Sequence, residues 1–336
     1  MEGCNMIVPN SFNLKYIPNK EQEYLFYKKM AVAYADNSKS LRWCPAADCE
    51  YGAEVESVGV KCIECPCGWM YCFRCGLEDH RPCDCPLALE WTKKDEAGGA
   101  NAKWLLVNTK DCAKCKRPIE KNQGCNYMRC RHPGCQYEFC WLCLGDWKTH
   151  NDHFKCNKFD NLSKEEKDKL NNSEQDKRQE LQKYVFYYER YMNNNMAIES
   201  ANKIMKTLKK EQKEIAINLA LTLTQLEFLE NGCQVLRNAK RTLKWSYAYG
   251  FYLSNDLQRN LYEIIQEKMD MYSSELHVLM EKDYETAKNN IGDFTKFKEK
   301  VLSAMFKCRQ SCDAFLEKME GSLGGWVVNK NFLFRV

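Results

Sequence analysis

The sequence predicts two small cysteine-rich modules, irregular with short β-hairpins, followed by an all-α helical bundle. Cysteine placement predicts the modules, because 17 of the 21 cysteines lie between Cys44 and Cys156. Proline placement predicts the bundle, because residues 157–320 contain no proline and are rich in Lys, Glu, Gln, Leu, Met and Tyr. That composition is typical of helices. A chain of 336 residues is long enough for about two or three domains.

The composition argues against two kinds of partner. The net charge of +4 arises from 50 basic and 46 acidic residues, so nucleic acid is not an expected partner. No run approaches the roughly 18 consecutive apolar residues of a membrane helix, and no secretory signal opens the sequence. We therefore expect a cytoplasmic protein, with the nucleus as a second location. Its thiols should stay reduced, which favours metal binding over the alternative of a disulfide-rich secreted region.

The first cysteine-rich module offers two sets of four zinc ligands. Structural zinc takes four tetrahedral ligands, which are thiolate sulfur or imidazole nitrogen atoms, and short spacings place two of them on one ion. Cys62 and Cys83 are surplus, although either could replace a neighbour. The predicted ligands are Cys44, Cys49, Cys65 and Cys67 for one ion, and Cys72, Cys75, His80 and Cys85 for the other.

The second module offers two more sets, with His153 as a substitute for His150. The two modules together predict about four structural zinc ions per chain. The predicted ligands are Cys112, Cys115, Cys130 and Cys135 for one ion, and Cys140, Cys143, His150 and Cys156 for the other.

One cysteine of the second module, Cys125, is left over from these sets. The preceding residues Asn122-Gln123-Gly124 favour a turn, so its thiol should be exposed. Basic residues nearby in the sequence, Lys121, Arg129 and Arg131, would lower the pKa of such a thiol and favour its use as a nucleophile. Spacing alone does not separate this interpretation from the alternative that Cys125 is a ninth metal ligand.

Apolar residues recur at helical spacing through the second half of the chain. A capping box from Ser163 to Glu166 precedes four apolar stripes, which begin near Leu181, Leu219, Leu257 and Phe294. These stripes predict four or five long amphipathic helices packed as a bundle. A shorter helix is expected from about Lys20 to Ala35. Residues expected in the core or without a ligand role are Cys233, Cys308, Cys312 and His277.

At this point the motifs resemble a known family, the RING-between-RING (RBR) E3 ubiquitin-protein ligases. The helical half, which opens around the segment Tyr184 to Met192, resembles the Ariadne subfamily. The similarity covers nearly the whole chain in order. The motifs that carry it are Cys44-Pro45-Ala46-x2-Cys49, Cys65-x-Cys67-Gly68, Phe73-x-Cys75-Gly76, Gly124-Cys125-Asn126-x-Met128 and Glu138-Phe139-Cys140-Trp141-x-Cys143-Leu144-Gly145.

The resemblance implies an acyltransferase. A first RING recruits a ubiquitin-loaded conjugating enzyme (E2), ubiquitin passes to Cys125 as a thioester, and a substrate lysine then receives it. The implied partners are ubiquitin, an E2, a protein substrate and a cullin-RING ligase, with no membrane. In relatives the Ariadne domain can cover the catalytic domain and restrain it.

The same resemblance divides the chain into domains. Residues 1–40 hold the end of a first RING and a linker helix, and residues 41–86 form the in-between-RING (IBR) zinc domain. Linker helices follow at 87–108, the catalytic RING2 (Rcat) zinc domain at 109–157, the helical Ariadne domain at 158–320 and a loosely ordered tail at 321–336.

Two departures from the family pattern stand out. Cys4 resembles the final ligand of a first RING whose other residues are absent, so the chain is a fragment, an incomplete gene model or a ligase that borrows recruitment. Tyr127 stands where the family usually has a histidine base, whereas Glu138 matches the family's acidic residue and His132 is nearby in sequence. Both departures favour an alternative, a catalytically weak zinc scaffold that docks ubiquitin or an E2 without turnover.

Overall fold

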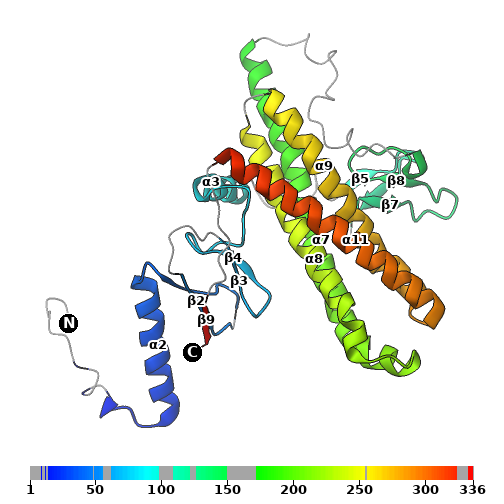
Figure 1. The fold of residues 1–336 in the computed structure, drawn as a ribbon. Coiled ribbons are helices and arrows are strands. Elements are labelled where there is room, and N and C mark those ends of the chain that lie inside the picture. The colour runs from blue at the N-terminus through cyan, green and yellow to red at the C-terminus, as the bar shows by residue number, and fades with distance from the viewer. Residues whose placement is uncertain are drawn as a thin grey trace. The chain divides into compact units, whose positions relative to one another are not determined.

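The structure, a computed structural model, describes residues 9, 12, 14–47, 49–55, 62–97, 109–121, 126–149, 172–253, 256–323 and 332–335. Short antiparallel hairpins precede a large helical bundle, which confirms the expected fold class (Figure 1). The chain divides into two compact units, Met1–Asp79 with Gly325–Val336 and His80–Gly324. Across the described ranges, no helix combines the length and apolar character needed to span a bilayer.

The described residues of the first unit form helix α2 and two small sheets. The helix begins where the Asn19 side chain accepts a hydrogen bond from the backbone of Gln22, at 2.8 Å, and so matches the expected helix start. One sheet has the order β1-β2-β9, in which the tail supplies a strand antiparallel to β2 (Figure 1). The elements are α2 (Lys20–Asn37), β1 (Leu41–Trp43), β2 (Tyr51–Glu54), β3 (Cys62–Glu64), β4 (Met70–Cys72) and β9 (Phe332–Arg335).

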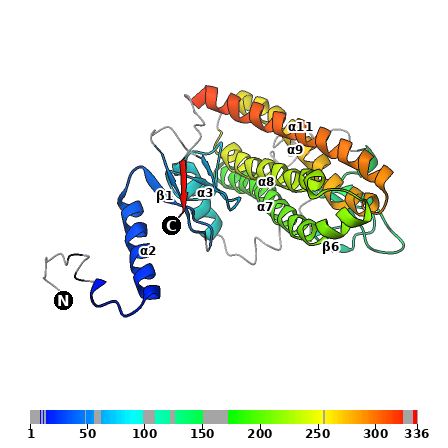
Figure 2. The same ribbon diagram turned by 60° about the horizontal axis from the view of Figure 1, so that its bottom comes forward.

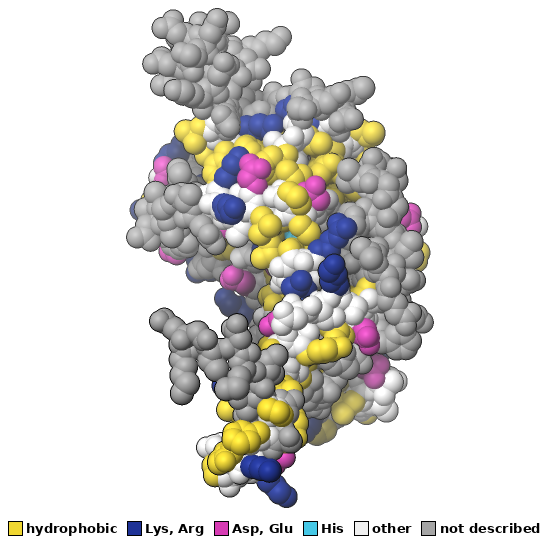
Figure 3. Space-filling model, turned by 90° about the vertical axis from the view of Figure 1, so that its left-hand side faces the viewer, with side chains coloured by type: hydrophobic (Ala, Val, Ile, Leu, Met, Phe, Trp, Pro, Cys, Tyr) yellow, Lys and Arg dark blue, Asp and Glu magenta, His cyan; other side chains and the backbone are white. Residues whose placement is uncertain are grey.

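Helix α2 exposes several large aromatic side chains. Tyr24 and Tyr27 are about half exposed, and Tyr34 is 72% exposed. In the view of Figure 3, hydrophobic side chains lie at the surface beside Lys and Arg side chains. Exposed apolar groups of this kind are common on protein surfaces when they stand singly.

The second unit opens with a helix and two hairpins. The hairpin strands are three residues long, and only β8 contains buried side chains, so two hairpins of this size need more than a hydrophobic core for stability. The elements are α3 (Cys85–Ala97), β5 (Thr109–Asp111), β6 (Pro118–Glu120), β7 (Tyr127–Arg129), β8 (Glu138–Cys140) and the 3₁₀ turn η1 (Trp147–Thr149).

Long helices make up the rest of the second unit and run alongside one another (Figure 2). Thr222 and Gln225 form a capping box that starts α8, whereas the predicted box at Ser163 lies outside the described residues. Cys233 and Cys308 are 1% and 0% exposed in the core, and Cys312 packs against it. The helices are α7 (Asn172–Asn218), α8 (Leu223–Tyr252), α9 (Asp256–Val278), the π-helical turn η3 (Leu279–Asp283), α10 (Tyr284–Ala287) and α11 (Ile291–Leu323).

Trp91 anchors α3 to the bundle. Its side chain is fully buried, and its ring centroid lies 5.4 Å from that of Tyr191 and 5.6 Å from those of Tyr184 and Phe251. Edge-on and tilted ring pairs at such distances stabilise beyond the area that they bury. Helix α3 begins at Cys85, a predicted zinc ligand, so Trp91 holds a ligand-bearing helix against α7 and α8.

Trp91→Ala should therefore lower the stability of the helical unit by about 3–5 kcal/mol, the usual cost of removing a buried aromatic ring. The measurement is the urea midpoint of the helical circular-dichroism signal. Trp69→Ala is the matched control, because Trp69 is 41% exposed and its replacement should leave that midpoint nearly unchanged. Equal midpoints for the two variants would show that α3 is not held by this ring.

Candidate zinc clusters and the segment beside Cys125

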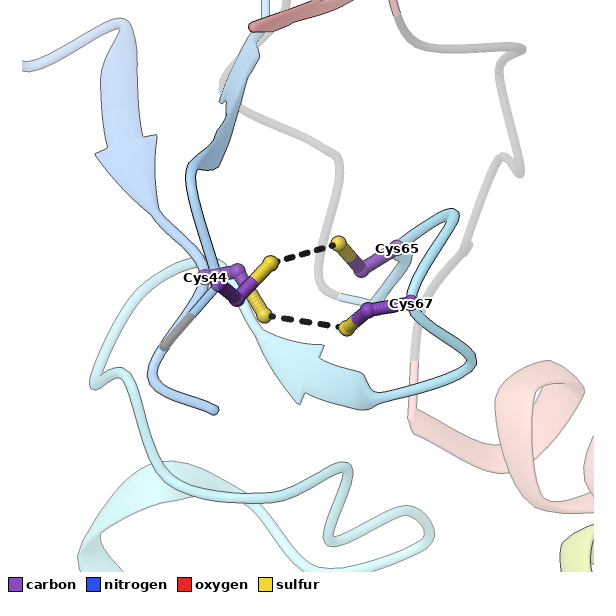
Figure 4. A group of neighbouring side chains, drawn as sticks. Cys44, Cys65 and Cys67 are labelled. Carbon is purple, nitrogen blue, oxygen red and sulfur yellow. Dashed lines mark hydrogen bonds between the residues drawn. The ribbon is translucent and has the colours of Figure 1, made fainter. Parts of the chain in front are cut away.

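Four thiols of the first module meet in one cluster. The sulfur atoms of Cys44, Cys49, Cys65 and Cys67 all lie within 4.8 Å of one another. Cys44 and Cys67 are 3.7 Å apart, and Cys49 and Cys65 are 3.6 Å apart. Figure 4 shows the thiols of Cys65 and Cys67, which lie in the turn between β3 and β4, pointing toward Cys44. Four sulfur ligands at about 2.3 Å from a zinc ion stand about 3.8 Å from one another, so the cluster fits zinc.

Burial keeps two of these thiols, Cys44 and Cys65, protonated when no metal is bound. It raises the pKa of the Cys44 thiol to about 12, and it raises the pKa of the Cys65 thiol as well. Such thiols hold their protons at neutral pH. Zinc binding must therefore displace those protons, so affinity for the metal should rise with pH.

A second cluster combines Cys72, Cys75, His80 and Cys85, whose ligand atoms also lie within 4.8 Å of one another. The Nδ1 atom of His80 donates a hydrogen bond to the carbonyl oxygen of Cys83 at 2.9 Å, because a carbonyl oxygen can only accept. That hydrogen bond leaves Nε2 as the metal-binding nitrogen.

The surplus cysteine Cys83 is fully buried, and its thiol donates a hydrogen bond to the Trp245 carbonyl oxygen, so its sulfur belongs to the core.

The third cluster is made by Cys112, Cys115, Cys130 and Cys135 in the second module. Cys112 and Cys135 are 3.8 Å apart, and Cys115 and Cys130 are 3.7 Å apart. Burial raises the pKa of Cys112, but hydrogen bonds from the backbone amides of Cys115 and Lys114 outweigh it and bring that pKa to about 7. This set also supplies the four ligands that a structural zinc ion takes.

The fourth predicted set is only partly described. Cys140 and Cys143 lie in the described part of the chain, whereas His150 and Cys156 lie outside it, as does the substitute His153. The turn at Cys140 nevertheless has the geometry of the turns in the other clusters. The Cys140 amide donates to the Gly145 carbonyl at 2.9 Å, the Leu144 amide donates back to Cys140 at 2.8 Å, and Leu144 has φ 58°.

The same backbone pattern recurs at two other cysteine pairs. The Cys72 amide donates to Leu77 and the Gly76 amide donates to Cys72, and the Cys112 amide donates to Arg117 while the Lys116 amide donates to Cys112. Gly76 and Lys116 share the positive φ, at 75° and 57°. Since non-glycine residues seldom adopt this conformation, its recurrence at Leu144 supports metal binding by Cys140 and Cys143.

The candidate nucleophile Cys125 lies outside the described residues, but both ends of its segment are placed. Lys121 and Asn126 are 2% and 8% exposed. The Asn126 carbonyl accepts a hydrogen bond from the Trp141 amide at 2.7 Å, and its side-chain oxygen accepts one from Asn193 of α7. The residue that directly follows Cys125 is thus fixed both to its own module and to the helical bundle.

Two other predicted site residues, Tyr127 and Glu138, come together. The Tyr127 hydroxyl donates to Oε1 of Glu138 at 2.6 Å. The register of β7 and β8 places Glu138 opposite Arg129, so Tyr127 reaches it diagonally on the same face of the hairpin. His132 does not join this pair, but it lines the same groove of about 800 Å³ as Tyr127.

Side chains from the bundle also contact this module, and the sequence analysis did not identify them. The Lys282 ammonium of η3 lies 3.5 Å from the centroid of the Tyr127 ring, and the Lys110 ammonium forms an ion pair with Glu189 of α7. Burial lowers the pKa of the nearby His277 to about 3, and the positive charges of Lys240 and Lys121 lower it further in the same direction. The His277 imidazole is therefore neutral at pH 7. No spacing in the sequence signals the contact of Lys282 with Tyr127 or the ion pair of Lys110 with Glu189, because the partners in each are at least 79 residues apart.

Comparisons with known proteins agree with these modules. A family model described as an IBR domain, a half RING-finger domain, matches residues 25–85, and a second model described as an IBR domain matches residues 107–163. The fold and clusters therefore define a zinc-binding protein of the IBR type.

Curated relatives extend the similarity over most of the chain. The E3 ubiquitin-protein ligase dbl4 of Schizosaccharomyces pombe is 31% identical over 97% of this chain and 64% of its own length. The E3 ubiquitin-protein ligase ari-1.1 of Caenorhabditis elegans is 30% identical over 98% of this chain and 65% of its own length. The E3 ubiquitin-protein ligase ariadne-1 of Drosophila melanogaster is 29% identical over 94% of this chain and 61% of its own length. The chain is thus similar over nearly its whole length to RING-between-RING ligases of the Ariadne type, and it spans just under two thirds of the length of these relatives.

Elemental analysis should find about four zinc ions per chain, as the clusters require. Cys67→Ser and Cys140→Ser should each lose one, because each removes a ligand. Cys62→Ala and Cys83→Ala are the matched controls and should retain the full number. A chelator should unfold the hairpins and leave most of the helical signal. Two or fewer zinc ions in the intact protein would contradict the ligand assignment.

Proposed function

We propose that this chain is the module of an RBR-type E3 ubiquitin ligase that carries ubiquitin on Cys125. Ubiquitin arrives from an E2 as a thioester and leaves to a substrate lysine. The observation that carries the proposal is that Cys112, Cys115, Cys130 and Cys135 form a complete cluster without Cys125. The relatives that match most of the chain are E3 ubiquitin-protein ligases by name, which supports the same function.

The proposed chemistry is two acyl transfers. The Cys125 thiolate attacks the carbonyl carbon of the E2 thioester, and the E2 cysteine leaves as its thiolate. A substrate lysine amine then attacks the new thioester, the carbon–nitrogen bond forms, and Cys125 leaves with the carbon–sulfur bond broken. The amine must lose protons on the way, and with Tyr127 at the usual histidine position these protons pass to solvent, with Glu138 beside Tyr127 as the alternative acceptor. Zinc holds the hairpins in shape and takes no part in the transfer.

Domain roles follow from this proposal. Residues 41–86 serve as the IBR domain, 109–157 as the catalytic domain, and 158–320 as the Ariadne domain. The contacts of α7 and η3 with Asn126 and Tyr127 support a restraining role for the Ariadne domain, because they engage the residues next to Cys125. An E2, ubiquitin and a cullin-RING ligase are the proposed partners.

A scaffold that binds ubiquitin without turnover is the second candidate. One observation favours it. Tyr127 replaces the usual histidine, and its hydroxyl donates to Glu138, so it is a hydrogen-bond donor at a position where a base is expected. The two candidates differ in whether Cys125 forms a thioester.

Cys125→Ser tests the nucleophile directly. The variant should keep the full zinc content and the helical signal, and should lose the thiol-sensitive ubiquitin adduct that forms with a loaded E2. An oxyester that resists thiols should form slowly in its place, because serine is the weaker nucleophile at neutral pH. Loss of a zinc ion from this variant would identify Cys125 as a ligand and sink the proposal.

Tyr127→His tests the missing base. A free lysine has a pKa near ~10.4, so discharge of the thioester by the parent protein should be slow at pH 7 and rise steeply with pH. Histidine, with an unperturbed pKa near ~6.5, is largely neutral at pH 7 and can accept the proton, a role typically worth about 10²–10⁴-fold.

The rate of single-turnover discharge of the preformed Cys125 adduct to lysine is measured at several pH values for the parent, Tyr127→His and Tyr127→Phe proteins. Tyr127→Phe is the control, since it keeps the ring, supplies no base and should show no comparable gain. Fast discharge by the parent at pH 7, with no gain from Tyr127→His, would point to His132 or Glu138 as the base.

A further inference from the structure

One groove of the second unit gathers basic side chains. It has a volume of about 800 Å³ and is lined by residues of the second cysteine-rich module and of η3. Its acidic lining residues are Glu120 and Glu281. The basic side chains outnumber them and are those of Arg117, Arg129, Arg131 and Lys282. The groove therefore concentrates positive charge in a chain whose net charge is only +4.

The arginine side chains of this groove are available to a ligand. Arg117, Arg129 and Arg131 are exposed, and within the described ranges none of their guanidinium groups has a hydrogen bond or an ion pair. Lys282 differs, because its ammonium lies 3.5 Å from the centroid of the Tyr127 ring. A guanidinium group carries five N–H donors in a fork that matches a carboxylate. The chemistry that these three arginines recognise is thus a set of acidic groups.

The turns of the third cluster hold the arginines in place. The Cys112 amide donates to the Arg117 carbonyl oxygen at 2.8 Å, in the turn that carries a metal ligand. Arg129 and Arg131 flank Cys130, a ligand of the same cluster, which is 2% exposed. Because Cys130 is buried and both its neighbours are exposed, the two arginines project away from the cluster. The charges are positioned before a ligand arrives, which lowers the entropic cost of binding.

The groove also suits the backbone of an extended polypeptide. Ile119 of β6 and Met128 of β7 both line it and supply apolar contact. Among the described strands, β6 pairs with β5 and β7 pairs with β8, so each has one edge without a neighbouring strand. Such an edge presents N–H and C=O groups that an extended peptide can pair with.

A nucleic acid fits this lining less well than a peptide does. Its backbone carries a charge on every phosphate, so part of it would have to pass Glu120 or Glu281. Single strands also stack their bases on aromatic faces, and the Lys282 ammonium already covers one face of Tyr127. A peptide can place its carboxylates opposite the arginines alone.

We propose that this groove binds an extended acidic segment of another protein, whose carboxylates pair with Arg117, Arg129 and Arg131. The proposal concerns binding alone and does not depend on acyl transfer to Cys125. It goes beyond the proposed function because it assigns the second cysteine-rich module a surface that selects partners by charge. Glu120, on β6, sets a limit on where the carboxylates of that segment can lie.

Fluorescence anisotropy of a labelled peptide with the full chain tests the proposal. The peptide has about ten residues that alternate glutamate with threonine, so that an extended chain presents carboxylates on one face about 7 Å apart. We expect saturable binding at about 0.05 M salt and much weaker binding at about 0.3 M salt, because the ion pairs are screened. The same peptide with glutamine in place of glutamate should not bind. Equal binding of the two peptides would overturn the proposal.

Charge variants locate the site. Arg117→Gln, Arg129→Gln and Arg131→Gln should each weaken binding roughly 1.5- to fivefold, the range for an exposed ion pair. Glu120→Gln should strengthen binding by a similar factor, a gain that a folding defect cannot produce. Lys114→Gln is the matched control, since Lys114 is an exposed basic residue of the same module that does not line the groove. Its affinity for the peptide should equal that of the parent protein.

Further measurements separate binding from folding. Zinc content and the helical circular-dichroism signal are recorded for every variant and should match those of the parent. Arg117→Gln lies on a different turn from Cys130, so it reports on the groove even if a change beside Cys130 disturbs the cluster. Parent-like affinity in all three arginine variants, or an equal loss in Lys114→Gln, would contradict the proposal. Displacement of the peptide by single-stranded RNA at a lower concentration than by unlabelled peptide would also contradict it, because the groove would then favour a nucleic acid.

Discussion

The hairpins of this protein depend on the neutralisation of clustered thiols by a metal ion. Strands of three or four residues form only small apolar cores, and the sulfur atoms that supplement these cores lie within 4.8 Å of one another. Four thiolates at that distance repel strongly, whereas protonated thiols leave the turns with little to connect them. A zinc ion removes both problems, and the sulfur separations of 3.6–3.8 Å match a tetrahedral site. The binding energy of the metal is then part of the folding energy of each module.

The turns that carry the metal ligands also position Tyr127 and Glu138. Cys130 follows β7 directly and Cys140 ends β8, so the ligands hold the two strands that carry Tyr127 and Glu138. A shift of one residue in that register would turn Glu138 to the opposite face of the hairpin and break its hydrogen bond with Tyr127. The position of the carboxylate beside the tyrosine is thus a consequence of metal binding two residues away.

Polar interactions join the second cysteine-rich module to the bundle. Among the described residues they include the hydrogen bond from Asn193 to Asn126, the ion pair of Lys110 with Glu189, and the Lys282 ammonium over Tyr127. If each contributes about 1 kcal/mol, the docked arrangement is favoured by roughly 3 kcal/mol, or about a hundredfold. A partner protein that binds only the open arrangement can overcome a bias of that size. The core of the bundle, by contrast, is built on buried leucines and aromatic rings and should not change when the module separates.

The sequence by itself determined the metal chemistry and the helical half. Cysteine spacing is local, so the pairs Cys44/Cys49, Cys65/Cys67 and Cys112/Cys115 could be assigned to shared ions, and the sulfur atoms of these pairs do meet. Helical periodicity is local as well, and it located the bundle. The tertiary structure alone decided which distant side chains touch: Lys282 on Tyr127, Asn193 on Asn126 and Cys83 against Trp245. Sequence patterns extend over a turn or a strand, whereas these pairs depend on how two folded parts pack, and packing is fixed by the sum of many weak contacts that no short motif records.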